Sequence, residues 1–168
     1  MTQQTLAEAM TLTPTREGAL IARLTRDFSN APLAMDPDQG APFGGLMAAL
    51  AARAAREGLD IAPPLQTLTV QYLAAARFEA CAFQPTLLRG GRSVAFARVD
   101  AGQPDRPALS ALATFGKTSP SADVKPLTAP VTPFADLDDT PVDPNLAPWF
   151  TRYIEHRFDG GPRLGGGN

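Results

Sequence analysis

The stretch APFGGLMAALAARAAREG, residues 41–58, decides the architecture of this chain. Gly44 and Gly45 stand in front of a run made mostly of Ala, the residue with the highest helix propensity. Apolar residues recur at helical spacing and form one stripe, which consists of Leu46, Met47, Leu50 and Ala54. Gly58 is a typical helix stop. The stretch therefore predicts a thin helix from 44 to about 57, one that can lie close against a sheet or be wrapped by one.

The segments around this helix have the patterns of strands. Residues 17–26 predict one strand, and a loop rich in Pro, Asp and Asn follows over 27–43. A short lead-in helix is expected within residues 2–10. After the long helix, four further strands are expected over 65–75, 78–89, 92–101 and 107–116. The order of one strand, one long helix and a strand meander predicts an α+β domain with a single antiparallel sheet.

Three details sharpen the strand predictions. In residues 65–75, Leu68, Val70 and Tyr72 share one face, while Thr67, Thr69 and Gln71 share the other. Gly90-Gly91 predicts a hairpin turn between two strands. Pro85 has no N–H to donate, so it predicts a bulge or a sheet edge.

Composition excludes several classes of protein. The chain has 168 residues, 44% of them hydrophobic, which suits one domain with a real core. A net charge of −2 leaves no basic stripe for nucleic acid. Its apolar runs fall short of the ~20 residues that cross a bilayer, and residues 1–10 lack the features of a signal peptide. With only Cys81 and His156 of their types, neither a disulfide within the chain nor a His/Cys metal site is expected. We expect a cytoplasmic protein without metal, nucleic-acid or membrane partners.

The character of the chain changes after Lys117. Residues 118–148 contain seven of the seventeen prolines and five aspartates, which predicts a linker or a tail that is packed on the protein surface. Large side chains return with Trp149, Phe150 and Tyr153. Residues 149–168 are therefore expected to start a second unit or to form a C-terminal tail.

Four ordered motifs resemble a known family. The chain resembles acyl-CoA thioesterases of the hotdog fold in four stretches, which are APFGGLMAALAARAA, LQTLTVQYLAAARFEA, LLRGGRSVAFARVDA and ALSALATFG. The resemblance is strongest to the N-terminal half of the TesB-like (acyl-CoA thioesterase II) double-hotdog proteins. It covers residues 11–117, and WFTRYIEHRFDGGP resembles the segment that opens the second hotdog. The resemblance implies an α+β hotdog, in which a long antiparallel sheet wraps one central helix.

The resemblance also implies a chemistry, hydrolysis of acyl-CoA thioesters in fatty acid metabolism. The family needs no cofactor beyond the coenzyme A of the substrate, and its backbone donors to the thioester carbonyl lie at the start of the central helix. Those positions are Gly44, Gly45 and Leu46 here. Such donors contribute about 3–4 kcal/mol to transition-state stabilisation in acyl transfer. Alternatively, the glycines only allow close packing of the helix.

A catalytic carboxylate is not evident at this helix. The family's acidic residue lies on or beside the helix in the second half of the double-hotdog proteins. Here the helix has no Asp or Glu before Glu57, which falls at the wrong end. Asp38, with Asp36 beside it in the preceding loop, is the candidate, and the alternative is a pair of solvated loop acids.

Other polar residues are candidates for substrate contacts. Thr69 and Gln71 could orient a water molecule, or they could be a solvated strand face. Arg89 and Arg92 flank the Gly90-Gly91 turn, where they could meet coenzyme A phosphates or simply lie in solvent. Tyr72 is a further contact candidate, and its alternative is a core or interface position.

Two functions from different classes remain open at this point. The chain could be an acyl-CoA thioesterase or half of one. It could instead be a non-catalytic acyl-CoA-binding or assembly module, which the missing carboxylate favours. Because a lone hotdog leaves a sheet edge open, we expect a homo-oligomer or pairing with a second hotdog half.

Overall fold

The computed structural model describes residues 4–118, 132–139 and 141–159. Its helices, 3₁₀ turns and strands are, in chain order, α1 (Leu6–Ala9), β1 (Thr13–Pro14), β2 (Leu20–Arg23), η1 (Arg26–Phe28), η2 (Pro37–Gln39), α2 (Gly44–Gly58), β3 (Leu65–Tyr72), β4 (Ala80–Gly90), β5 (Val94–Gln103), β6 (Arg106–Gly116), η3 (Phe134–Asp136) and η4 (Trp149–Tyr153).

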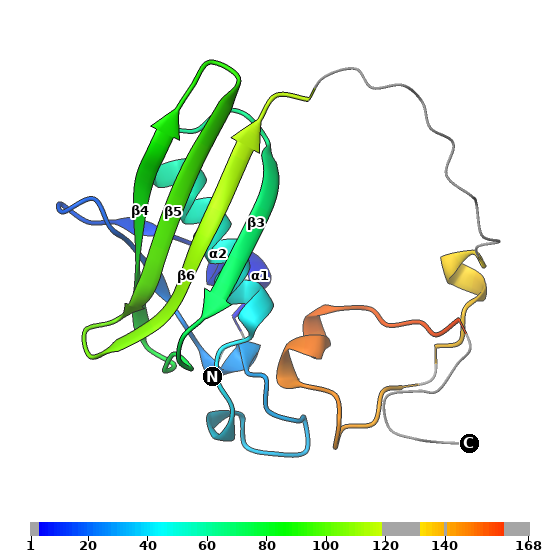
Figure 1. Ribbon diagram of the computed structural model, residues 1–168. Coiled ribbons are helices and arrows are strands. Elements are labelled where there is room, and N and C mark those ends of the chain that lie inside the picture. Colours follow the sequence, from blue (N-terminus) through cyan, green and yellow to red (C-terminus); the bar gives the residue numbers. More distant parts are fainter. Residues whose placement is uncertain (1–3, 119–131, 140, 160–168) are drawn as a thin grey trace.

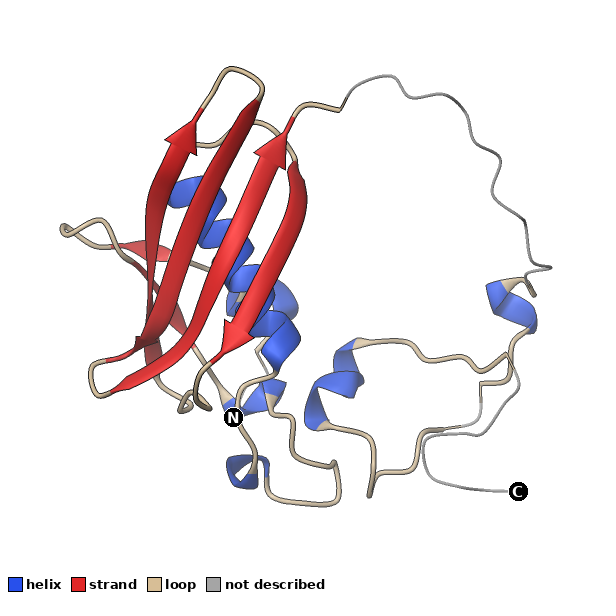
Figure 2. Cartoon of the chain, viewed as in Figure 1, coloured by secondary structure: helices blue, strands red, loops and turns tan. Residues whose placement is uncertain are grey.

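The strands form one antiparallel sheet with α2 lying along one of its faces (Figure 1, Figure 2). The strand order is β1-β2-β4-β5-β6-β3, so β3 is the strand at one edge of the sheet. The long hairpins β4–β5 and β5–β6 form its centre. The predicted α+β class, with one antiparallel sheet and one long central helix, is confirmed.

The small side chains of α2 let the helix lie close to the sheet. Its buried positions, four of which belong to the predicted stripe, are Leu46, Met47, Leu50, Ala51, Ala54 and Ala55. They pack against β4, β5, β6 and β3, which also present many alanines on their inner face. The helix and the sheet can therefore pack closely, because small side chains cover both facing surfaces. The larger buried side chains Phe83, Phe115 and Leu109 fill the remaining core.

The meander agrees with its sequence pattern. Side chains of β5 alternate between buried and exposed from Val94 to Ala101, so one face looks at α2 and the other at solvent. In β3, Thr67, Thr69 and Gln71 are exposed, whereas Leu68 and Val70 are partly buried and pack against the core. The predicted strands differ from the observed ones by at most three residues at either end.

Pro85 lies where the sequence predicts it. Strand β2 pairs with β4 only as far as Phe83, so beyond that point β4 is an edge strand. Pro85 pairs with Val99 of β5 on its other side, and a register shift follows between Leu87 and Arg89. The missing N–H of the proline therefore costs no ladder hydrogen bond on the open side.

The N-terminal region differs from the prediction of one strand over 17–26. The structure has a small hairpin instead, in which β1 pairs with β2. Gly18, with φ of +83°, makes the turn, and the Ala19 N–H donates to Thr15 Oγ1 at 3.1 Å. The expected lead-in helix is also shorter, because the capping box of Thr5 and Glu8 starts α1 only at Leu6.

The C-terminal region folds back onto the first domain. An isolated bridge joins Pro148 to Pro32, and the Trp149 N–H donates to the Ala31 carbonyl at 2.9 Å. Much of the predicted linker, residues 119–131 and 140, lies outside the described residues, as do residues 160–168. The division into residues 11–117, 118–148 and 149–168 stays a prediction. None of the described helices is long and apolar enough to cross a membrane.

Candidate functional site at the start of the central helix

The first turn of α2 presents unpaired backbone donors. Phe43 is the N-cap residue, its N–H donates to the Phe28 carbonyl at 2.8 Å, and no side chain caps the helix. The first hydrogen bond of the helix runs from the Met47 N–H to the Phe43 carbonyl at 3.1 Å. By helix geometry the N–H groups of Gly44, Gly45 and Leu46 have no acceptor within the helix. These donors lie at the positive end of the helix dipole, which suits a developing oxyanion.

The loop before α2 is held by its own polar groups. Buried Ser29 donates to the Pro37 carbonyl at 2.7 Å and accepts from the Ala31 N–H at 3.1 Å. Asn30 Oδ1 accepts from the Ala41 N–H at 2.8 Å. A Cβ on Gly40 would come within 2.5 Å of Ser29 Oγ, so only glycine fits there. These contacts fix the path of the chain into the helix.

Both glycines at the helix start are in contact with aromatic rings. The Tyr72 hydroxyl donates to the Gly44 carbonyl at 2.6 Å, and a Cβ on Gly44 would lie 3.2 Å from that hydroxyl oxygen. A Cβ on Gly45 would collide with the ring of Phe43. These contacts favour the packing explanation of the glycines, and Gly45 is exposed. Their role as oxyanion donors stays a prediction.

Aromatic residues of the C-terminal segment complete this region. The rings of Phe43 and Phe150 stack with centroids 3.6 Å apart and planes 12° apart. The rings of Phe28 and Tyr153 stack at 4.3 Å and 13°. Sequence patterns did not indicate the contact between Phe43 and Phe150, because no local pattern connects positions so far apart. The only sign was the return of large side chains after Ala147.

Asp38, the predicted catalytic carboxylate, lies in η2 and is paired with Arg26. The distance from Asp38 Oδ2 to Arg26 Nη2 is 3.0 Å, and both side chains are about half exposed, at 48% and 52%. Within the described residues no hydrogen bond joins Asp38 to the first turn of α2. Its catalytic role stays a prediction, and the observed ion pair is what a solvated loop acid would make. No group of three metal-ligating residues occurs in the described parts of the chain.

The predicted substrate contacts fall in two places. Tyr72 reaches the helix start, and Leu46 is there too, although its side chain is 4% exposed and belongs to the core. Thr69 on β3 and Arg89 on β4 instead line one hollow of about 560 Å³ on the outer face of the sheet, with β5 and β6 between them. Gln71 shares that outer face, and Arg92 is exposed in the β4–β5 turn. Of the predicted substrate contacts, Tyr72 is the one whose polar group binds the helix start.

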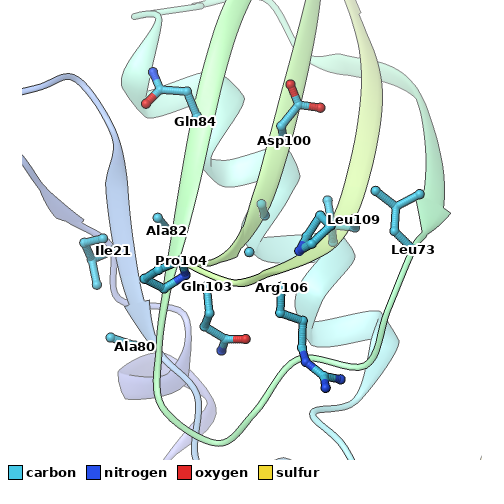
Figure 3. Close-up of a pocket in the computed structure, with 13 residues that line it drawn as sticks. Ile21, Leu73, Ala80, Ala82, Gln84, Asp100, Gln103, Pro104, Arg106 and Leu109 are labelled. Carbon is cyan, nitrogen blue, oxygen red and sulfur yellow. The ribbon is translucent and has the colours of Figure 1, made fainter.

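A second hollow, of about 690 Å³, lies beside the β5–β6 turn (Figure 3). Its polar lining comes from Gln84, Asp100, Gln103 and Arg106, and its other walls are mostly apolar. Asp100 accepts from the Ser110 hydroxyl at 2.7 Å and pairs with Arg98 at 3.0 Å. No residue predicted for the site lines this hollow.

Cys81 is a core residue. Its side chain is fully buried, and burial raises the pKa of the thiol to about 11. A thiol that stays protonated at neutral pH is no nucleophile.

Comparison with known proteins identifies the family. A family model described as "Acyl-CoA thioesterase N-terminal domain" matches residues 31–116, about half of the chain. This chain belongs to that family. The matched region begins in the loop that precedes α2 and ends at the end of β6. No curated protein matches the chain.

Solved structures confirm the hotdog fold. A hot dog fold protein from Alicyclobacillus acidocaldarius superposes with a TM-score of 0.74 at 22% identity, covering 89% of this chain and 53% of its own. Acyl-CoA thioesterase II TesB2 from Mycobacterium marinum gives 0.62 at 19% identity, covering 79% and 47%. A tesB protein from Mycobacterium avium subs paratuberculosis gives 0.63 at 16%, covering 79% and 49%. The chain spans about half the length of these relatives, and the TesB-like resemblance is confirmed.

Proposed function

We propose that this acyl-CoA thioesterase N-terminal domain binds acyl-CoA thioesters at the start of α2 and serves as half of a double-hotdog thioesterase. The observation that carries this proposal is the first turn of α2, where Gly45 is exposed, the N–H groups of Gly44 and Gly45 have no acceptor within the helix, and the Tyr72 hydroxyl binds the Gly44 carbonyl. A thioester carbonyl bound there would have its oxygen stabilised as negative charge develops. No cofactor is required beyond the coenzyme A of the substrate.

Hydrolysis needs a general base that activates a water molecule, and the source of that base has to be considered separately. Asp38 is held by Arg26 in the structure, which favours a carboxylate supplied by a second hotdog half. The alternative is a non-catalytic acyl-CoA-binding module, and the same ion pair supports it. Both hypotheses place acyl-CoA at the helix start, so a measurement of turnover distinguishes them.

The edge of β3 supports pairing with a second unit. Strand β3 pairs with β6 on one side only, and its eight residues contain neither Pro nor Gly. Beyond the register shift between Leu65 and Thr67, this open edge is a template for a further strand. We propose that a second hotdog half, or a second copy of the chain, occupies it. Sedimentation analysis should give a dimer for the chain alone, and a strict monomer at micromolar concentration would count against self-pairing.

The test is thiol release from a panel of short, medium and long acyl-CoAs. The 168-residue chain is compared with Gly45→Val, in which a side chain fills the helix start, and with Gly90→Val in the distant hairpin as the matched control. Turnover lost only in Gly45→Val supports an enzyme with its site on α2. Binding without turnover supports the binding module or a missing second half. Absence of binding refutes the proposal for this chain. We expect the activity in the cytoplasm, within fatty acid metabolism, which fractionation of the producing cell would check.

A further inference from the structure

The aromatic contacts at the helix start extend beyond residues 11–117 into the C-terminal segment. Phe43 is both the N-cap of α2 and the residue whose ring lies beside Gly45. The same ring stacks against Phe150, which belongs to η4 in the C-terminal segment. A flat contact with centroids 3.6 Å apart restrains the tilt and rotation of the Phe43 ring.

The backbone of the C-terminal segment is attached to the same loop. The Phe150 N–H donates to the Ser29 carbonyl at 3.2 Å, and the Trp149 N–H donates to the Ala31 carbonyl at 2.9 Å. Ser29 follows Phe28, whose carbonyl accepts the N–H of Phe43. Phe150 is therefore held at the helix start in two ways. Its ring stacks on Phe43, and the backbone N–H groups of Trp149 and Phe150 donate to the loop before α2.

We propose that Phe150 is a positioning residue for the helix start, acting through Phe43. By holding the Phe43 ring beside Gly45, it fixes the direction in which the first-turn N–H groups of α2 point. The C-terminal segment is then a working part of the acyl-thioester site rather than a connection to it. The effect of Phe150 on catalysis rests on the proposed function, whereas its positioning of Phe43 does not.

The positioning can be measured without a ligand. Two amides report on the helix start: the Phe43 N–H, bonded to the Phe28 carbonyl, and the Met47 N–H, bonded to the Phe43 carbonyl. Hydrogen exchange of the full chain, resolved by NMR, should be about tenfold faster at both amides in Phe150→Leu than in the unmodified chain. Exchange in the central strand β5, for example at Val99, should not change.

Two further variants make the test specific. Phe150→Tyr keeps the flat ring and should retain the slow exchange. Phe134→Leu removes a phenyl ring from another part of the C-terminal region, where it contacts Arg157, and should have no effect on Phe43 or Met47. Unchanged exchange at Phe43 and Met47 in Phe150→Leu would overturn the proposal. Equal acceleration throughout the sheet would also overturn it, because Phe150 would then support only general stability.

Binding of a thioether analogue of acyl-CoA, which cannot be hydrolysed, separates this inference from the proposed function. Affinity should fall about tenfold in Phe150→Leu and be restored in Phe150→Tyr. If the unmodified chain binds none of the analogue, the proposed function fails while the exchange result still decides the role of Phe150. If affinity is equal in all variants although exchange at Phe43 rises, the C-terminal segment is not part of the binding site.

Discussion

The hydroxyl of Tyr72, at the end of the edge strand β3, donates a 2.6 Å hydrogen bond to the carbonyl oxygen of Gly44 in the first turn of α2. This bond joins the open edge of the sheet to the proposed oxyanion donors. Tyr72 is 56% exposed, so its ring serves this contact rather than the filling of the core.

Tyr72→Phe should lower the free energy of unfolding by about 0.5–1 kcal/mol, because one hydrogen bond of an exposed side chain is lost. Urea denaturation measures this change. Tyr153→Phe is the matched control, since it removes a hydroxyl that donates to the Gln4 carbonyl at 2.8 Å. Only Tyr72→Phe should shift the NMR amide signals of Gly44 and Gly45. Identical spectra of the helix start in the two variants would show that the bond does not hold Gly44.

Gly45→Ala should destabilise the protein by about 1–3 kcal/mol, because the new methyl group displaces the Phe43 ring and breaks its stack on Phe150. Gly44→Ala should stay within about 0.5 kcal/mol of the unmodified chain. There the neighbour is the movable hydroxyl end of Tyr72, and Ala favours the helix. Thermal and urea unfolding of both variants test this order. A Gly45→Ala protein as stable as the unmodified chain would mean that the Phe43 ring moves aside freely.

Burial of Cys81 should make stability depend on alkaline pH. Its folded-state pKa is raised to about 11 from the ordinary 9.0, so the unfolded chain releases the proton first. Stability is therefore unaffected by this group below pH 9 and declines as pH rises from about 9 to about 11. Cys81→Ala should lack that part of the decline. Alkylation by iodoacetamide at pH 8 should require unfolding, and rapid labelling of the native protein would contradict the burial.

The ion pair of Arg77 and Asp105 should contribute at the acidic end. Arg77 lies before β4 and reaches Asp105 in the β5–β6 turn at 2.7 and 3.0 Å, and its guanidinium holds the pKa of that carboxyl below the ordinary 3.8. The stabilisation is present above about pH 4 and is lost as pH falls further. Asp105→Asn should remove this dependence, so the variant should be slightly less stable than the unmodified chain above about pH 4 and equally stable in more acidic solution. An unchanged acid-unfolding profile would show that solvent screens the pair fully.

The sequence predicted the central helix and the meander because their patterns are local. Ala content and apolar spacing predicted a helix from 44 to about 57, and the structure has Gly44–Gly58. Alternation predicted which residues of β3 share a face. The strand predicted over 17–26 is observed at Leu20–Arg23, because the Gly18 turn precedes it and η1 begins at Arg26.

The site was only partly predictable for the same reason. Gly44, Gly45 and Tyr72 come together in the structure, and the motif placed the glycines correctly at the helix start. The stack of Phe43 on Phe150 depends on how the C-terminal segment folds back, which no periodicity encodes. The two faces of β3 were predicted, but not their consequence: Thr69 is exposed on the face away from α2, where it lines the same hollow as Arg89.

The central claim is that acyl-CoA binds at the start of α2. The most direct test is an NMR titration of the ¹⁵N-labelled chain with a thioether analogue of acyl-CoA. The account predicts saturable shifts of the amide signals of Gly44, Gly45 and Leu46, larger than those of Thr69 and Arg89 on the outer face of the sheet. Shifts confined to the outer face, or no binding, would contradict it.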